Sequence, residues 1–122
     1  MIVIDTSAVI AIVADEPMAA TCSNVLKQQS STIISAGTLT ELLIVAARRG
    51  LLTETRDLIE AFVTDIIDLT PERAEQAAAA YVLWGKTLHP AALNFGDCFS
   101  YATAREFACP SSISATTLPA PT

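Results

Sequence analysis

Three carboxylates in this chain stand where a metal ion could be bound, namely Asp5, Glu41 and Asp97. Asp5 follows three β-branched residues in a row, a pattern typical of a strand that is buried on both faces. Ligands of open α/β sheets bind outside the carboxyl ends of such strands. Glu41 and Asp97 each stand at or near the expected start of a helix, in apolar surroundings. Carboxylates gathered without Lys or Arg repel one another, and an all-oxygen ligand set favours Mg²⁺ or Mn²⁺ over zinc.

Each of the three acids also has a purely structural explanation. Asp5 is a suitable N-cap for the helix expected after it. Glu41 completes the pattern Thr-x-x-Glu with Thr38, which is typical of a capping box, and Asp97 could cap the helix that follows it. Taken singly, Asp5 and Asp97 are explained about as well by helix capping as by metal binding. Glu41 is explained better by capping. The three acids together, on an α/β scaffold, favour a metal site.

The elements that must position these acids alternate between strand and helix, which predicts βαβ units and a parallel sheet. At 122 residues the chain is one domain, long enough for a core of its own. Strands are expected over residues 2–5, 32–35 and 66–69. Helices are expected over residues 7–13, from 15 to about 29, over 38–49 and 53–63, from 70 to about 83, and over 97–107, with a loop at 85–96.

The charge balance limits how the chain could bind nucleic acid. It carries 7 Lys and Arg against 13 Asp and Glu, so its formal net charge is −6. A protein that grips nucleic acid along its length is usually basic. We therefore expect the chain to bind RNA weakly without metal and to recognise a local RNA feature. Its negative charge also suits a basic peptide as a partner.

The cysteines and the hydropathy pattern indicate the compartment. Cys22, Cys98 and Cys109 are an odd number without paired spacing, which is typical of buried thiols in a reducing compartment. The longest apolar run near the N-terminus, residues 8–14, is too short to span a bilayer, and no basic segment precedes it. A soluble cytoplasmic protein without a membrane partner is expected.

Two other hydrolase classes fit the residues less well. Cys98 lies beside Asp97, but His89 is the only histidine and no independent signal indicates a base, so a cysteine hydrolase is set aside. A phosphatase with Asp5 as its nucleophile is disfavoured, because the Asp-x-Asp pattern of such enzymes is missing and position 7 is Ser.

Three stretches resemble the PIN-domain ribonucleases and, within them, the VapC-type toxins of bacterial toxin–antitoxin pairs. They are IVIDTSAV at residues 2–9, ISAGTLTE at 34–41 and HPAALNFGDCFSYA at 89–102, in the order and at the spacing of that family. The last stretch is the most specific. The resemblance implies a three-layer α/β/α sandwich around a mainly parallel sheet, over residues 1–110.

The same resemblance implies a function and its partners. Asp5, Glu41 and Asp97 would be the catalytic residues and the Mg²⁺ ligands of an endoribonuclease that hydrolyses RNA phosphodiester bonds. A cognate antitoxin and a second copy of the chain would be its protein partners. Thr6 and Ser7 could contact a ligand or the phosphate. Trp84, Lys86 and His89, in the segment before Asp97, are further candidates for RNA or phosphate contacts.

The ending departs from the family. Residues 111–122 are almost entirely Ser, Thr, Ala and Pro, where family members show an apolar strand followed by Gly-Asp-Asp-Phe and a fourth acid. Suppose that the reading frame shifts so that each new codon begins on the third base of an old one, starting in the codon of Pro110. The DNA that encodes the tail can then also encode V-L-Y-I-G-D-D-F-A-R-T-D, which is the family ending. A frameshift is therefore our hypothesis, against an ordinary disordered tail. Without the fourth acid, a catalytically impaired PIN-fold module that binds antitoxin without cutting RNA is the second hypothesis for function.

Overall fold

The computed structural model describes residues 1–85 and 94–111. Its sheet contains three parallel strands in the order β1 (Ile2–Val3), β2 (Thr32–Ser35) and β3 (Asp65–Ile67). Val3 lies opposite Ile33, and Ile34 lies opposite Ile66. All four residues of β2 are buried, as expected for a strand with a neighbour on each side. The parallel sheet that the strand–helix alternation predicts is therefore present.

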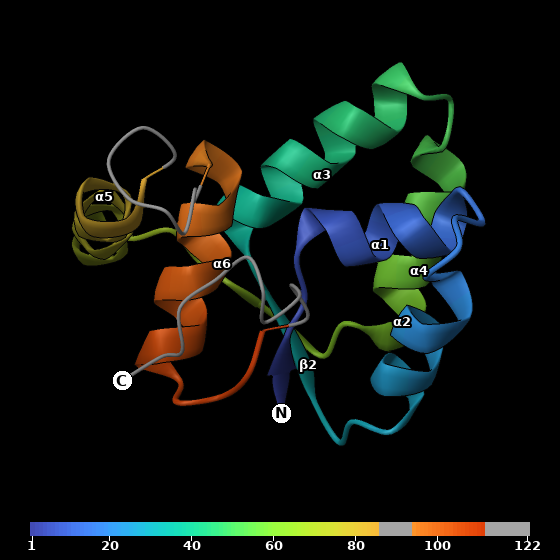
Figure 1. Ribbon diagram of the computed structural model, residues 1–122, viewed down its shortest axis with the longest axis horizontal. Helices are drawn as coiled ribbons and strands as arrows, with labels where there is room; N and C mark the ends of the chain where they lie inside the picture. Colours follow the sequence, from blue (N-terminus) through green and yellow to red (C-terminus); the bar gives the residue numbers. More distant parts are fainter. Residues whose placement is uncertain (86–93, 112–122) are drawn as a thin grey trace.

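Helices cover both faces of this sheet (Figure 1). On one side α1 packs against α2, α3 and α4, and on the other α6 contacts β1 and β2, with α5 packed behind it. This is the three-layer α/β/α arrangement expected from the sequence. The helical bounds are α1 (Thr6–Val13), α2 (Ala19–Lys27), α3 (Ala36–Arg48), α4 (Leu52–Phe62), α5 (Pro71–Trp84) and α6 (Phe95–Glu106).

The β-branched residues of the strands divide between two cores. Side chains of successive strand residues point to opposite faces, so a run of Ile and Val fills both layers at once. Ile2, Ile4 and Ile34 belong to the core formed with α1–α4. Val3 and Ile33 belong to the core formed with α6 and with Cys109, which follows that helix. The sequence Ile2-Val3-Ile4 therefore holds the layers together just before Asp5.

Two expected helix starts were wrong. Helix α3 begins at Ala36, because the hydroxyl of Ser35 accepts from the N–H of Gly37 at 3.1 Å and caps the helix there. Thr38 is consequently inside the helix, and the predicted capping box between Thr38 and Glu41 does not form. Helix α6 begins at Phe95, two residues before Asp97, so positions 95 and 96 of the expected loop are helical. Residues 86–93 of that loop lie outside the described residues.

Smaller differences concern the second helix and the third strand. Asp15 adopts a positive φ of 53°, which Asp tolerates in tight turns, and α2 begins only at Ala19. Strand β3 ends at Ile67, so Leu69 lies outside the sheet and is 43% exposed.

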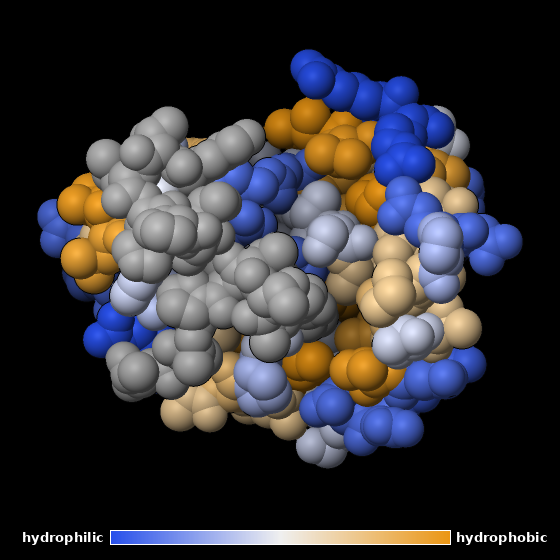
Figure 2. Space-filling model, viewed as in Figure 1, coloured by the Kyte–Doolittle hydropathy of each residue, from blue (hydrophilic) through white to orange (hydrophobic). Residues whose placement is uncertain are grey.

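The surface carries apolar side chains over α3. Figure 2 shows them gathered along this helix, next to the hydrophilic tip where it ends. Ile44 on α3 is 52% exposed, and Phe95 at the start of α6 is 74% exposed. Within residues 1–85 and 94–111, no helix combines the length and the apolar character that a membrane span requires.

Candidate metal centre

Asp5 lies between the end of β1 and the first turn of α1. Its carboxylate accepts from the backbone N–H of Ala8 at 3.4 Å and from the hydroxyl of Ser7 at 2.9 Å, and Asp5 is only 3% exposed. The predicted N-cap is therefore observed. Capping and chemistry do not exclude each other here, because a capping carboxylate is held in one orientation at the positive end of the helix.

Glu41 is fixed from two sides. The hydroxyl of Thr6 donates a 2.6 Å hydrogen bond to Oε1 of Glu41, which joins the start of α1 to α3. On the other side the carboxylate lies against Gly96, where any β-carbon would overlap it. A glycine at the first turn of α6 therefore lets that turn approach the carboxylate of Glu41.

Asp97 is the third residue of α6 and closes a capping box with Asn94. The N–H of Asp97 donates to the side chain of Asn94 at 2.9 Å, and the N–H of Asn94 donates to the carboxylate of Asp97 at 3.1 Å. Asn94, rather than Asp97, is the N-cap. Burial raises the pKa of Asp97 above its ordinary value, the Asn94 N–H opposes the rise, and the negative charge of Glu41 adds to it.

These contacts bring the three acids to one region of the fold. Thr6, next to Asp5, binds Glu41, and Glu41 lies against Gly96, next to Asp97. In the arrangement seen here, no three Asp, Glu, His or Cys side chains of the described ranges are grouped so that they could hold one ion. Joint binding of a metal by the three acids therefore stays a prediction.

The chemistry of the donors suits a hard divalent cation. The side chains offer oxygen only, and the negative charge of Glu41 adds to the burial that raises the pKa of Asp97. In the described part of the chain, the ion pairs join Arg49 to Glu16 and Arg73 to Asp68 and Glu106. Among these residues, therefore, no Lys or Arg forms an ion pair with Glu41 or Asp97. A cation would relieve this repulsion.

A buried hydrogen bond aligns the two helices that carry Glu41 and Asp97. The hydroxyl groups of Thr38 on α3 and Ser100 on α6 lie 3.1 Å apart, and both residues are at most 1% exposed. Sequence reasoning missed this pair, because nothing local marks partners that are 62 residues apart. It also missed Asn94, although Asn-x-x-Asp is a recognisable variant of the capping-box pattern.

The remaining predicted contact residues are placed as follows. Thr6 and Ser7 start α1 and donate to Glu41 and Asp5, respectively. Trp84 ends α5 and packs edge-on against Tyr101, so it belongs to a helix rather than to the expected loop. Lys86 and His89 lie outside the described residues.

Cys98 is not arranged as a nucleophile. It is 3% exposed, and its thiol donates to the carbonyl oxygen of Asn94 at 3.3 Å. Burial, followed by the charge of Asp97, raises the pKa of Cys98 to about 11, so the thiol is protonated at neutral pH. This agrees with setting a cysteine hydrolase aside.

Two apolar hollows flank the acids. One, of about 660 Å³, runs between α1 and α2 and includes Ser7 and Cys22; the charge of Asp5 contributes to the raised pKa of that thiol. The other, of about 390 Å³, lies between α3 and α6 and includes Glu41 and Gly96. Asp5 and Glu41 are thus each next to a surface on which an apolar partner could rest.

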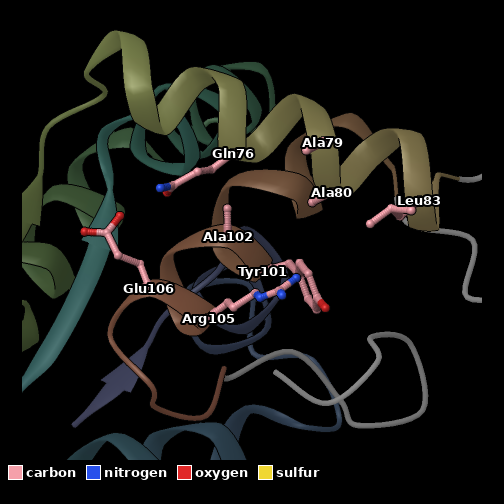
Figure 3. A pocket seen from close by; sticks show the side chains of 8 residues that line it. All are labelled: Gln76, Ala79, Ala80, Leu83, Tyr101, Ala102, Arg105 and Glu106. Carbon is pink, nitrogen blue, oxygen red and sulfur yellow. The ribbon is translucent and has the colours of Figure 1, made fainter. Parts of the chain in front are cut away.

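A third cavity, of about 370 Å³, lies between α5 and the C-terminal half of α6 (Figure 3). Tyr101, Arg105 and Glu106 of α6 and Gln76 of α5 line it. Its lining contains none of the three acids, whereas Asp97 is in the first turn of α6. This cavity therefore has no direct part in the candidate centre.

Comparisons with known proteins find relatives along most of this chain. The PIN domain family matches residues 2–113. Ribonuclease VapC36 of Mycobacterium tuberculosis is 42% identical over 109 residues, which cover 84% of this chain and 77% of that protein. Ribonuclease VapC28 of the same species is 40% identical over 106 residues, covering 84% and 80%.

A solved structure supports the fold independently. The toxin VapC20 of Mycobacterium tuberculosis superposes with a TM-score of 0.70 over 89% of this chain and 85% of that one, at 19% sequence identity. VapC20 itself is a toxin that cleaves the sarcin–ricin loop. At this identity the likeness establishes the fold, whereas the curated relatives establish the family. The chain belongs to the PIN-domain family and, within it, to the VapC-type ribonucleases.

Proposed function

We propose that this chain is a Mg²⁺-dependent endoribonuclease and the toxin of a toxin–antitoxin pair. The observation that carries the proposal is the position of Glu41, whose carboxylate lies against Gly96 in the first turn of α6 and accepts the hydrogen bond from Thr6 at the start of α1. Asp5 and Asp97 stand at the starts of α1 and α6, and the carboxylate of Glu41 contacts both of these helix starts. Mn²⁺ has the same preference for oxygen ligands and is the natural substitute ion.

In this proposal Asp5, Glu41 and Asp97 hold the ion. When bound, Mg²⁺ supplies Lewis-acid polarisation of a phosphate oxygen and a water of lowered pKa for in-line attack. Helix N-termini at Asp5 and Asp97 offset part of the negative charge of the three acids. The Thr6 hydroxyl orients Glu41, and the Asn94 N–H orients Asp97. The hydroxyl of Ser7, at an exposed position, donates to Asp5 in this arrangement and would have to turn away from Asp5 to donate to a phosphate oxygen.

The negative net charge of the chain favours recognition of a local RNA feature over binding along an extended stretch of RNA. With a net charge of −6, the chain repels phosphates at long range. A divalent cation would offset two of the three negative charges of these acids and would weaken this repulsion where cleavage would occur. We expect RNA affinity to rise with Mg²⁺ concentration until the site is filled, the opposite of the simple salt dependence of a basic groove.

The antitoxin is proposed to rest in the hollow between α1 and α2. An amphipathic helix fits an apolar groove of about 660 Å³, and a following basic residue could place its cation among the acids next to Ser7. Loss of affinity after Asp5→Ala and Asp97→Ala would support direct occupation of the acidic site. If a cognate antitoxin bound both variants as well as the parent chain, that mode of inhibition would be wrong.

The second copy of the chain is proposed to cover the apolar face between α3 and α6. Ile44, Leu69 and Phe95 line this face and are 52%, 43% and 74% exposed. Ile44→Glu should shift the chain toward monomer in sedimentation experiments. Val82→Glu is the matched control, because Val82 is 66% exposed on α5, away from this face. Equal effects of both variants would argue against this interface.

Asp97→Asn tests the catalytic role. Asn keeps an oxygen that can accept from the Asn94 N–H, so the capping box and the fold should remain, while Mg²⁺-dependent cleavage should be lost. Asp57→Asn, at an exposed position of α4, is the control and should cleave normally. Equal cleavage by Asp97→Asn would overturn the mechanism. A parent chain that binds antitoxin but cuts no RNA would favour the second hypothesis, a catalytically impaired PIN-fold module.

A further inference from the structure

The cavity between α5 and the C-terminal half of α6 has a fixed apolar wall (Figure 3). Ala79 and Leu83 of α5 line it, and Leu83 is 56% exposed, so this wall can be reached from solvent. Tyr101 of α6 is buried, and its ring packs edge-on against Trp84 with the ring centroids 6.5 Å apart, which fixes its place in the lining. A flat molecule could therefore rest on this wall without any rearrangement of the aromatic rings.

Polar side chains line the same cavity and make it locally positive. Arg105 is exposed, and among residues 1–85 and 94–111 it forms no ion pair. Glu106 also lines the cavity, but its carboxylate accepts from Nε and Nη2 of Arg73 at 3.0 to 3.3 Å, so its charge is compensated. Gln76 adds an amide that can both donate and accept. One uncompensated guanidinium therefore faces a small, partly apolar space, in a chain whose net charge is −6.

Arg105 also has a structural explanation. It lies in the last turn of α6, where a cation offsets the negative end of the helix macrodipole. This effect is weak at an exposed position and does not use the N–H donors of the guanidinium. Those donors stay suited to an anion, and a planar guanidinium is well matched to a phosphate.

The cavity and the candidate centre lie along one side of α6. Asp97, Tyr101 and Arg105 follow one another at intervals of four residues, so they form one ridge of the helix. Eight residues correspond to a rise of about 12 Å along a helix. A single RNA strand that crosses the candidate centre at Asp97 could therefore follow this ridge as far as the cavity.

We propose that this cavity binds a nucleotide of the RNA substrate that flanks the cleaved bond. Its phosphate would bind Arg105, the apolar face of its base would pack on Ala79 and Leu83, and the polar edge of the base would meet the amide of Gln76. The proposal rests on the proposed function, which brings RNA to Asp97. It also explains how an acidic chain holds RNA with few cations, because packing of a base does not depend on charge.

The first experiment uses AMP as a probe without Mg²⁺, so that the three acids repel its phosphate. In NMR spectra of the ¹⁵N-labelled parent chain, AMP should shift the signals of the Gln76 amide and of Nε–H of Arg105. Adenosine and inorganic phosphate each lack one half of the nucleotide, so they should produce smaller shifts at equal concentration. Shifts of these signals that are no larger with AMP than with phosphate would overturn the assignment of a nucleotide.

Three variants assign the response to the cavity. Arg105→Gln should weaken AMP binding roughly ten-fold, because a charge-assisted contact is lost. Gln76→Leu should weaken the response to AMP but not the smaller response to phosphate. Arg56→Gln is the matched control, because Arg56 is exposed on α4 and has no ion pair in the described ranges, so the variant should bind AMP like the parent chain. Equal losses in Arg105→Gln and Arg56→Gln would mean that only the overall charge matters, and the cavity would be the wrong site.

The second experiment measures cleavage of a single-stranded RNA at fixed Mg²⁺ and increasing salt. Arg105→Gln should raise KM roughly ten-fold, change kcat little, and reduce the slope of log(kcat/KM) against log salt by about 0.7, whereas Arg56→Gln should leave KM unchanged. Active chains with the same KM in both variants would overturn the proposal and leave the proposed function intact. If the parent chain cuts no RNA, the proposed function fails, and the AMP titration alone decides about the cavity. Weaker binding of the cognate antitoxin to Arg105→Gln, with an unchanged response to AMP, would assign the cavity to the protein partner and overturn the proposal.

Discussion

Gly96 lies so close to the carboxylate of Glu41 that a β-carbon at position 96 would overlap it. Helix propensity favours Ala over Gly, so Gly96→Ala would stabilise an isolated helix. In this fold we expect the opposite, a loss of about 1–3 kcal/mol in the free energy of unfolding, because the carboxylate must move from its place between Thr6 and α6. Cleavage of RNA should fall with it. Urea denaturation and a cleavage assay measure the two effects.

The same substitution in a Glu41→Ala background is the control. There the carboxylate is absent, so Gly96→Ala should be neutral or stabilising. A loss of stability that is equal in both backgrounds would show that position 96 is constrained by something other than Glu41.

The hydroxyl of Thr6 is expected to hold Glu41 in place for metal binding. Thr6→Val keeps the shape of the side chain but removes the 2.6 Å hydrogen bond, so the stabilisation of the protein by Mg²⁺ should weaken. Thr6→Ser keeps the hydroxyl and should behave like the parent chain. Thermal midpoints measured across a Mg²⁺ titration would separate the two. Equal responses of Val and Ser at this position would mean that the bond is incidental.

The bond between Thr38 and Ser100 is expected to support both the fold and the site. Each single replacement, Thr38→Val or Ser100→Ala, leaves one buried hydroxyl without its partner and should cost about 1–3 kcal/mol of stability. The double replacement should cost less than the sum of the two single ones. Strict additivity in urea denaturation would show that the two hydroxyl groups contribute independently.

The fold could be predicted from the sequence because its strands are short and clearly marked. Ile2-Val3-Ile4 is β-branched throughout and ends at Asp5, and Thr32-Ile33-Ile34 is β-branched and lies between Ser31 and Ser35. Both stretches contribute neighbouring strands of the sheet. The helix starts were less predictable. Ser35 and Thr38 are both competent caps, and only the tertiary position of β2 selects the earlier one.

The candidate centre was predictable in part. Asp5, Glu41 and Asp97 could be selected from their residue type, their position and the family resemblance. The supporting groups could not, because Ser100 and Gly96 act through residues that are distant in sequence. Their roles depend on how α3 crosses α6, which no local pattern specifies.

The three thiols should make the protein less stable at alkaline pH. Burial, assisted by the charge of Asp5, raises the pKa of Cys22, and burial also raises the pKa of Cys109. Burial and the charge of Asp97 raise the pKa of Cys98 to about 11. The unfolded chain loses these protons from about pH 8.5 upward, while the folded chain keeps them, so stability should be complete below that pH and fall as the pH rises toward the folded values.

Urea midpoints at pH 8, 9 and 10 test this expectation. The parent chain should lose stability progressively over this range. Replacement of all three residues by Ala lowers stability at every pH through lost packing, but it should flatten the pH dependence, because the groups that titrate are gone. The difference in slope, rather than in absolute stability, is the informative quantity. Parallel curves for the two proteins would show that the thiols titrate alike in the folded and unfolded chains, and that burial does not protect them.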